Sequence, residues 1–407
     1  MASIWPSIIS LASKSSKPRI ACLSLGRRPS ASVLTIAIVF GLAPKASACP
    51  FCTTLAPSLS QWQDRAAIAA LVEVQEQDRD NQTRLLVHRA LKGADRLAGS
   101  NSLAIELDVT AKPGSLLLVF GSGAPTGLVG ELSWHAAAVN ETSYGYFARI
   151  PSLKTPTTER LIYFVQFLEH ADPLVAEDAY LEFGHASFDD VGRVADHLPM
   201  ARVRAWLTDP KVPQARKGFY GLVLGLATSG EARRANRELL GQLIAEPDDD
   251  FRGGFDGLLG GYLLLAGTEG LKVVESRYLA NPRAADGDVR HAQTALRFYW
   301  EYGREIPRAR ISQSARQLLA RGEFAESTIT DLARWKDWSD VDQIAALYAR
   351  PGFPQPATGR AVVGYLLTCP EPAGAKALNR LRKVDPQGVA AAEEVLSRTT
   401  TVQPNAQ

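Results

Sequence analysis

The hydrophobic periodicity changes once along the chain, and this change limits the fold more than any other feature. From about Ala66 to Ile150 the apolar residues fall in short, often alternating runs bounded by turn residues, which is typical of β-strands. Beyond Pro156 the period becomes 3.6 and stays there, which indicates helices. The sequence therefore predicts an α+β, multidomain protein, with a small β domain at 60–152 and an α-helical domain at 157–398.

The β domain is expected to be a small barrel. A turn at Pro113 and Gly114 precedes a run that is apolar on both faces, which suits a central strand. Five short strands in a domain of this size fit a closed barrel of the OB kind. The expected strands are 67–74, 84–91, 103–109, 115–120 and 143–150.

The helical domain is divided by helix-breaking residues. Asp172 and Pro173 are expected to begin a helix, with the aspartate as its cap and the proline in its first turn. The breaks leave room for helices of roughly 12 to 18 residues, the size found in α-solenoids, and the weak identity between units makes the array HEAT-like. Further breaks are expected at Pro199, Pro210, Gly230, Pro247, Pro282, Pro307, Pro351, Pro370 and Pro386.

The N-terminus has the composition of a signal peptide at 1–48. Basic residues ending at Arg27 and Arg28 precede an apolar segment, 33–42, that is too short to cross a bilayer. The Ala-Ser-Ala at 46–48 predicts cleavage before Cys49. The alternatives are an uncleaved signal anchor and a lipid anchor on Cys49. The mature chain is expected to be exported, in the periplasm, at the cell surface or outside the cell.

The charge of the mature chain argues against some partners. The formal net charge is +2, but six of the 45 bases and no acid lie in the signal peptide, which leaves 39 bases against 43 acids. A mature chain with this weakly negative net charge is not expected to bind nucleic acid or an anionic membrane. No transmembrane span is expected in the mature chain, and 399–407 is expected to be a disordered tail.

Three cysteines remain in the mature chain. Cys49 and Cys52 enclose Pro50 and Phe51, the spacing of a dithiol redox centre. In that alternative, Cys49 is the nucleophile and Cys52 the resolving thiol. The other interpretation is a structural disulfide or an N-terminal anchor, because no strand precedes the motif and a weak helix signal follows it. Cys369 ends an apolar run and is expected to be a small buried side chain.

Acidic and histidine side chains gather between 169 and 185. Glu182 and His185 share one helix face, which makes them weak candidates for a metal site of the Glu-x-x-His type. No second copy of that motif occurs, so a solvated face or buried ion pairs is the alternative. The remaining members of the group are Glu169, His170, Asp172, Glu177 and Asp178.

Two further groups are expected to be structural. Glycines at 253–261 interleave with apolar residues and predict close packing against a neighbouring helix. Aromatic residues at helical spacing are typical of a core, although they could also line a groove for a partner. These aromatic residues are Phe298, Tyr299, Trp300, Trp335 and Trp338. No cofactor is expected.

Four segments carry a resemblance to known proteins. The ACPFC at 48–52, YFVQFLEHADP at 163–173, AEDAYLEF at 176–183 and WKDW at 335–338 resemble a group of uncharacterised exported proteins of planctomycete-type bacteria. The resemblance implies that the protein is exported and that it has the two-part architecture. More loosely, a cysteine before a small barrel containing Leu91-Lys92-Gly93 is similar to netrin-like and metalloprotease-inhibitor domains, in which the terminal cysteine ligates the zinc of the target.

The sequence favours a non-enzymatic role. No nucleophile elbow or paired metal motif occurs in it, whereas helical solenoids commonly serve as binding surfaces. We therefore expect an exported scaffold or binding protein with an unknown protein partner. The enzyme alternative is a thiol-disulfide oxidoreductase that uses Cys49 and Cys52.

Overall fold

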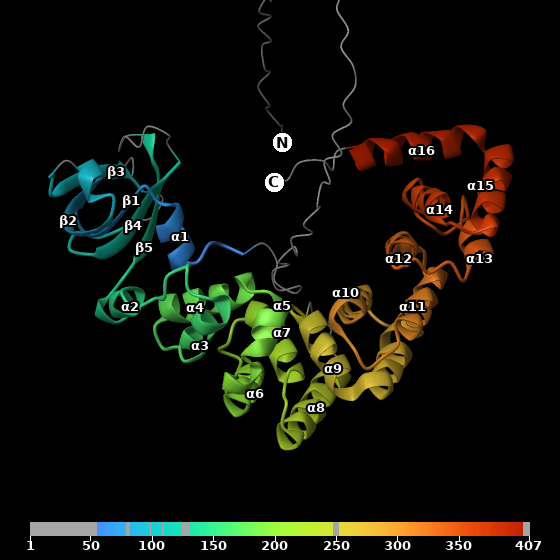
Figure 1. Cartoon of the computed structure of the whole chain (residues 1–407), viewed down its shortest axis with the longest axis horizontal. Helices are drawn as coiled ribbons and strands as arrows, with labels where there is room; N and C mark the ends of the chain where they lie inside the picture. Colours follow the sequence, from blue (N-terminus) through green and yellow to red (C-terminus); the bar gives the residue numbers. More distant parts are fainter. Residues whose placement is uncertain are drawn as a thin grey trace, which may run out of the picture. The chain divides into compact units, whose positions relative to one another are not determined.

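The computed structural model of the chain describes residues 55–78, 82–97, 99–107, 110–123, 131–246 and 252–401. All of them belong to one unit that runs from Ala46 to Gln407. The predicted signal peptide at 1–48, and Cys49 and Cys52, lie outside the described residues. Along the chain, a short helix and a sheet come first and a long series of helices follows (Figure 1).

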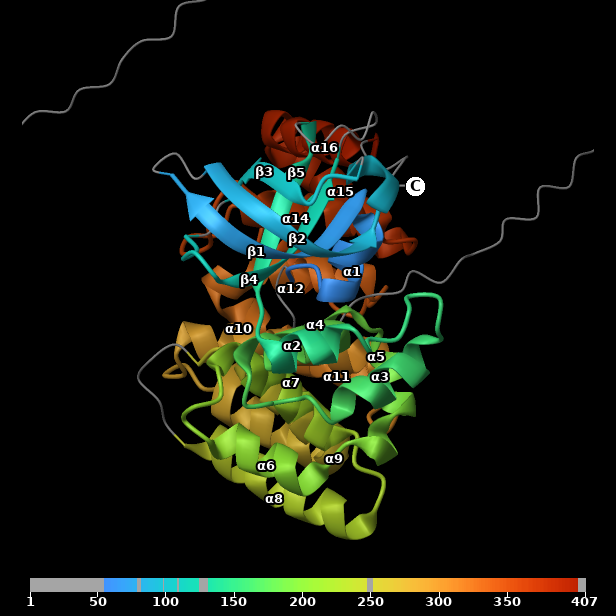
Figure 2. The ribbon, with the colours of Figure 1, turned by 90° about the vertical axis from the view of Figure 1, so that its left-hand side faces the viewer.

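The sheet is antiparallel, with the strand order β3-β2-β1-β4-β5. Its strands are β1 (Ile68–Gln77), β2 (Gln82–Lys92), β3 (Ser102–Glu106), β4 (Leu116–Ser122) and β5 (Ser133–Ala138). Strand β4 lies between β1 and β5, and its apolar side chains are buried on both faces, which confirms the predicted central strand. Figure 2 shows the curl of the strands.

Alternation along β1 gives the sheet two apolar faces. Ile68, Ala70 and Val72 pack in a core that is made by the sheet and its own loops. Ala69, with Phe120 of β4, packs instead in a core shared with the helices. The period of two along a strand separates the two sets. The sheet is therefore attached to the helices by one of its faces.

One predicted strand is wrong. Residues 143–147 of the predicted strand 143–150 belong to helix α2 (Glu141–Phe147). Asn140 caps this helix by accepting a hydrogen bond from the N–H of Ser143 (3.0 Å), and the serine hydroxyl accepts in return from the N–H of Asn140 (2.9 Å). The fifth strand is β5, whose run of three alanines carries little strand signal.

Helices make up the rest of the described chain. Helix α1 (Leu59–Arg65) and the turn η1 (Ala94–Leu97) accompany the sheet, and helices follow from residue 157 onwards, as the change of period predicts. Helix α16 continues to Thr401, which is inside the segment expected as a tail. The helices are α3 (Thr157–Val165), α4 (Pro173–His185), α5 (Phe188–Arg193), η3 (Ala195–His197), α6 (Met200–Thr208), α7 (Gln214–Gly225), α8 (Gly230–Ala245), α9 (Phe255–Val274), η4 (Glu275–Leu279), α10 (Asp286–Tyr302), α11 (Arg308–Arg316), η5 (Gln317–Ala320), α12 (Gly322–Arg334), α13 (Val341–Ala345), α14 (Ala357–Thr368), α15 (Pro372–Val384) and α16 (Pro386–Thr401).

Glycines allow α7 and α9 to touch backbone to backbone. A Cβ on Gly257 would lie 2.0 Å from the carbonyl oxygen of Gly218, and a Cβ on Gly261 would lie 2.0 Å from that of Gly221. No side chain fits at these distances, so the glycines are required for the contact. The close packing predicted for residues 253–261 is confirmed.

Other predicted core residues are buried. Phe298, Tyr299 and Trp335 belong to the hydrophobic core, and the rings of Trp300 and Trp335 stack with centroids 4.6 Å apart. Cys369 is a buried free thiol, as predicted. The helical segment Phe255–Leu279 is long and apolar enough to span a bilayer by length and composition, and 67% of its most apolar window is buried inside the protein. Its apolar character therefore matches that of a core helix.

Candidate functional site

Helix α4 is the element that joins the beginning of the described chain to the helices. Asp172 caps it by accepting hydrogen bonds from the N–H groups of Leu174 (3.0 Å) and Val175 (3.3 Å), and Pro173 occupies the first turn. This confirms the predicted start of the helix. Most of the helix is buried, so polar side chains on it must find partners inside the protein.

One face of α4 holds a segment that we call the strap, residues 55–60. Asp178, Glu182 and His185 occupy positions i, i+4 and i+7 of the helix and so share a face. Nε2 of His185 donates a hydrogen bond to the carbonyl of Ala56 (2.9 Å). The strap runs into the first turn of α1, so these three side chains hold the first of the residues that the structure describes.

Glu182 makes the strongest contact with the strap. The hydroxyls of Ser58 (2.7 Å) and Ser60 (2.5 Å) both donate to its Oε1, and Arg160 of α3 forms an ion pair with its Oε2. The side chains of Arg160 and Glu182 are only 9% and 6% exposed. Charge-assisted hydrogen bonds of this kind are about twice as strong as neutral ones, so they fix the strap, α3 and α4 to one another.

Asp178 binds the strap one turn earlier. Its Oδ1 accepts from the N–H of Leu59 (2.6 Å) and its Oδ2 from the hydroxyl of Tyr146 in α2 (2.7 Å). Burial raises the pKa of Asp178 to about 7, although both hydrogen bonds and the charge of Arg160 oppose the shift. Burial, with the charge of Asp178 next in importance, raises the pKa of Tyr146 as well. The hydroxyl of Tyr146 therefore stays a hydrogen-bond donor.

Helix α1, which continues from the strap, also contacts the sheet. The indole of Trp62 stacks on the imidazole of His135 in β5, with ring centroids 4.1 Å apart and planes 13° apart. Nζ of Lys92 donates to the carbonyls of Gln63 (3.1 Å) and Asp64 (2.6 Å). These carbonyls lie at the C-terminal end of α1, where the helix dipole stabilises a cation. Helix α1 is thus bound both to the sheet and to α4.

A second polar network connects α4 to α7. Arg216 of α7 donates to Oε1 of Glu169 (3.0 Å) and to Oε2 of Glu177 (2.5 Å), and the hydroxyl of Tyr220 donates to Glu169 (2.7 Å). Burial alone would lower the pKa of Arg216, but the hydrogen bonds with Glu177 and Glu169 raise it above its ordinary value. Glu169 has a positive φ of 52°, an unfavourable backbone conformation that these partners stabilise.

The structure divides the predicted polar cluster between two networks. Glu182, a weak metal candidate by sequence, is in a buried ion pair, and its partner candidate His185 binds the strap backbone. The predicted alternative of buried ion pairs is confirmed for Glu182 and Glu169. Within the residues that the structure describes, no group of three or more histidine, cysteine or acidic side chains could hold a metal ion.

The strap as a whole is not apparent from the sequence. The serine cap of α1 has a sequence signal, because Ser58 and Gln61 form a capping box. Arg160 carries no such signal, since its partner Glu182 is 22 residues away in the next helix. These residues become a site only when α1, α3 and α4 pack together.

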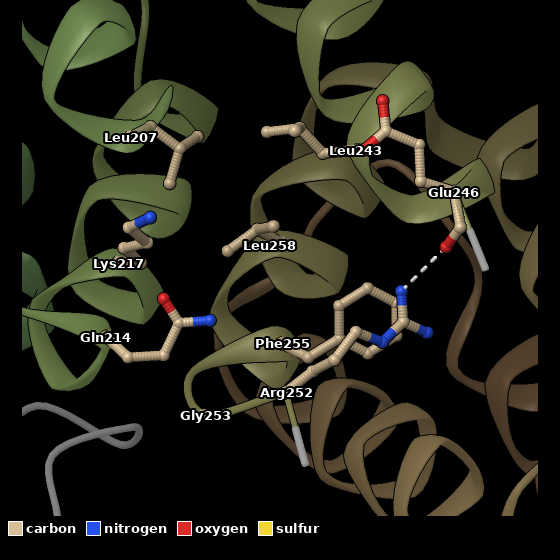
Figure 3. A pocket seen from close by; sticks show the side chains of 9 residues that line it. All are labelled: Leu207, Gln214, Lys217, Leu243, Glu246, Arg252, Gly253, Phe255 and Leu258. Atoms are coloured by element: carbon tan, nitrogen blue, oxygen red, sulfur yellow. Dashed lines mark hydrogen bonds between the residues drawn. The ribbon is translucent and has the colours of Figure 1, made fainter. Parts of the chain in front are cut away.

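A cavity of about 160 Å³ lies between α6, α7, the end of α8 and the start of α9 (Figure 3). The guanidinium of Arg252 faces it but is already bound. It donates to both carboxylate oxygens of Asp288 (3.1 and 2.5 Å) and to the carbonyl of Glu246 (3.1 Å), and it lies 3.5 Å above the ring of Phe255. The arginine therefore joins α9 to α10 rather than offering a free charge to a ligand.

Comparison of the chain with protein-family models, with curated proteins and with solved structures finds no match.

Proposed function

We propose that the chain is an exported, non-enzymatic scaffold or binding protein, whose array of helices presents an interaction surface to a protein partner. In this proposal the signal peptide 1–48 is removed, and the mature chain begins with Cys49 in the periplasm, at the cell surface or outside the cell. The weakly acidic mature chain supports a protein partner rather than nucleic acid.

One observation carries the proposal: six of the arginine–carboxylate pairs between helices have similar separations along the chain. The two partners are 34 to 39 residues apart in every one of these pairs. A repeated separation of this size corresponds to one helix pair of a solenoid. The pairs are Arg216 with Glu177, Arg252 with Asp288, Arg310 with Glu275, Arg297 with Asp331, Arg321 with Asp286 and Arg380 with Asp342.

The contacts between helices support a HEAT-like α-solenoid. Helices pack on those one or two places away in the chain, as α7 does on α9, α10 on α9, α12 on α14 and α14 on α16. Each unit of a solenoid contacts only its neighbours, so its outer surfaces stay available for binding. For the β domain, the curled five-stranded sheet with β3 and β5 at its edges supports a partly open barrel of the OB kind.

The strap gives the proposed scaffold a firm connection to its N-terminus. Ala56, which is held by His185, is only seven residues after Cys49. A load applied to an anchor at Cys49 would therefore reach α4 and the helices through the hydrogen bonds that the Ser58 hydroxyl and the N–H of Leu59 donate. This arrangement supports the lipid-anchored form of the proposal as well as the unanchored one.

Intact mass spectrometry and crosslinking of the exported protein test the proposal together. The mass distinguishes a free Cys49 terminus, an acylated Cys49 and an uncleaved chain. A photo-crosslinker placed at Leu367 or Val384, which are exposed apolar residues of α14 and α15, should give one discrete protein adduct, and a crosslinker at the exposed Ile162 of α3 is the matched control. A chain that stays in the cytoplasm, or one that gives no adduct from any exposed helix position, contradicts the proposal.

The second candidate function is thiol–disulfide exchange. A cavity of about 370 Å³ borders the strap at Ser60 and strand β2 at Lys92. Cys52 is four residues before Ala56, so the dithiol is close along the chain both to the hydrogen-bonded strap and to this cavity. In this function the Cys49 thiolate attacks a substrate disulfide, and Cys52 then resolves the mixed disulfide. The substrate leaves as a dithiol, and Cys49 and Cys52 are left as a disulfide.

An insulin-reduction assay with dithiothreitol as electron donor separates the two functions. Turnover above the rate of dithiothreitol alone that is lost in Cys49→Ser would establish the oxidoreductase and refute the non-enzymatic scaffold. A Cys49–Cys52 potential below roughly −300 mV with no turnover would identify a structural disulfide. Cys369→Ser is the control, because that thiol is buried in the helical core.

A further inference from the structure

A cavity of about 390 Å³ lies near the C-terminal end of the helices, bordered by α14, α16 and the segment that follows α13. Its volume is in the range of small-molecule sites. Tyr348, Gln355, Arg360 and Asp385 supply its polar side chains, while Ala392 and Val395 of α16 supply an apolar wall. The side-chain oxygen of Gln355 already accepts a hydrogen bond from the N–H of Gly359 (3.1 Å). This cavity is separate in sequence from the strap and from both networks on α4.

The polar floor of the cavity is built from fixed groups. Asp385 accepts hydrogen bonds from the hydroxyl of Tyr348 (2.9 Å) and from the N–H of Gly388 (2.8 Å). A Cβ on Gly388 would lie 2.2 Å from the carboxylate and 2.7 Å from the tyrosine hydroxyl, so only glycine leaves room for both. The hydrogen bond from Gly388, followed by that from Tyr348, lowers the pKa of Asp385, and a negative charge therefore remains at the cavity.

Arg360 brings a positive charge that has no hydrogen-bond or ion-pair partner among the described residues. Of the arginine and lysine side chains in the described ranges, those that are buried or half-buried have a hydrogen-bond or ion-pair partner, with two exceptions, Lys217 and Arg360. Each of the two lines a cavity. A half-buried guanidinium has five donors and prefers a carboxylate.

The two opposite charges restrict what can bind. A simple carboxylate would pair with Arg360 but would be repelled by the negative charge of Asp385. A simple amine would pair with Asp385 but would be repelled by the positive charge of Arg360. A ligand that carries both groups satisfies both side chains. The small residues Gly359 and Ala392 and the edge of Val395 leave space for a modest apolar side chain next to these charges.

We propose that this cavity binds a free amino acid or a similarly small zwitterion, with the carboxylate on Arg360, the ammonium on Asp385 and the side chain against α16. This is a small-molecule site in addition to the proposed scaffold surface. A small ligand that makes two charge-assisted contacts is expected to bind with a Kd between about 1 μM and 1 mM.

Isothermal titration calorimetry of the mature chain against the common amino acids tests the proposal. Two chemically blocked series define the recognition, because N-acetyl amino acids lack the ammonium and amino acid amides lack the carboxylate. At least one free amino acid should bind, and both blocked forms of it should bind at least about tenfold more weakly. Equal binding of either blocked form would refute the zwitterion, and absence of binding at concentrations up to about 10 mM would refute the site.

Arg360→Gln assigns the binding to this cavity. It should raise the Kd of the best ligand by about tenfold or more, while the far-UV circular dichroism spectrum and the melting temperature stay unchanged. Arg304→Gln is the matched control, because Arg304 is an exposed arginine that does not line the cavity, and its affinity should equal that of the unmodified chain. Equal affinities for the two variants would overturn the assignment.

Discussion

Replacing Glu182 by glutamine is expected to remove the charge that balances Arg160. Both side chains are under 10% exposed, and Nε of Arg160 already has no hydrogen-bond partner within the described residues. The variant keeps an oxygen for the hydroxyls of Ser58 and Ser60 but leaves a buried guanidinium unpaired. Breaking a buried pair by removing one partner costs about 3 to 5 kcal/mol, so the free energy of unfolding should fall by this amount.

A double variant distinguishes this cause from a general loss of packing. In Arg160→Met with Glu182→Gln two neutral side chains replace the buried ion pair, so we expect a net loss of only about 1 to 2 kcal/mol, less than for Glu182→Gln alone. Urea unfolding of the mature chain, followed by far-UV circular dichroism, measures all three proteins. The exposed pair Glu394 and Arg398 is the control, and Glu394→Gln should change stability by about 0.5 kcal/mol or less. A double variant that is no more stable than Glu182→Gln would refute the reasoning.

Two further perturbations test other parts of the structure. Because burial raises the pKa of Asp178 from an ordinary value of 3.8 to about 7, the folded protein binds this proton more tightly than the unfolded chain. The contribution of Asp178 to stability is therefore full below pH 4 and is lost as the pH rises to about 7. In urea unfolding from pH 4 to 8, the free energy of unfolding of Asp178→Asn should rise relative to that of the unmodified chain by at most about 1.4 kcal/mol per pH unit. A difference that stays constant with pH would contradict this. Gly257→Ala, whose Cβ would lie 2.0 Å from the Gly218 carbonyl oxygen, should lower the free energy of unfolding by about 3 kcal/mol. Gly230→Ala, whose Cβ would have no atom within 4 Å, should stay within about 1 kcal/mol of the unmodified chain. Similar thermal and urea midpoints for the two variants would contradict the requirement for glycine between α7 and α9.

The sequence predicts the fold wherever a local pattern decides it. The unbroken series of helices begins after Pro156 as the change of period requires, and Asp172 with Pro173 begins α4 through a local cap. Residues 143–150 alternate like a strand, but the cap at Asn140 makes α2 instead. Strand β5 could not be predicted from its alanines, because its place is fixed by pairing with β4 rather than by its own propensity.

The candidate site is only partly predictable for the same reason. The positions of Asp178, Glu182 and His185 on one helix face follow from their spacing alone. Their partners do not, since Ser58 and Glu182 are 124 residues apart and no periodic pattern connects a strap to a distant helix. A buried carboxylate requires a partner, which is why buried ion pairs could be expected for this cluster without naming Arg160.

Backbone amide hydrogen exchange of residues 55–65 tests the central claim most directly, namely that the start of the described chain is clamped to α4. The N–H of Leu59 donates to the buried Asp178, so in the mature chain it should exchange on the order of a thousand-fold more slowly than in an unstructured peptide. The same amide should lose most of this protection in Asp178→Ala while the amides of α9 keep theirs. Exchange of Leu59 near the rate of a free peptide in the unmodified chain would contradict the clamp.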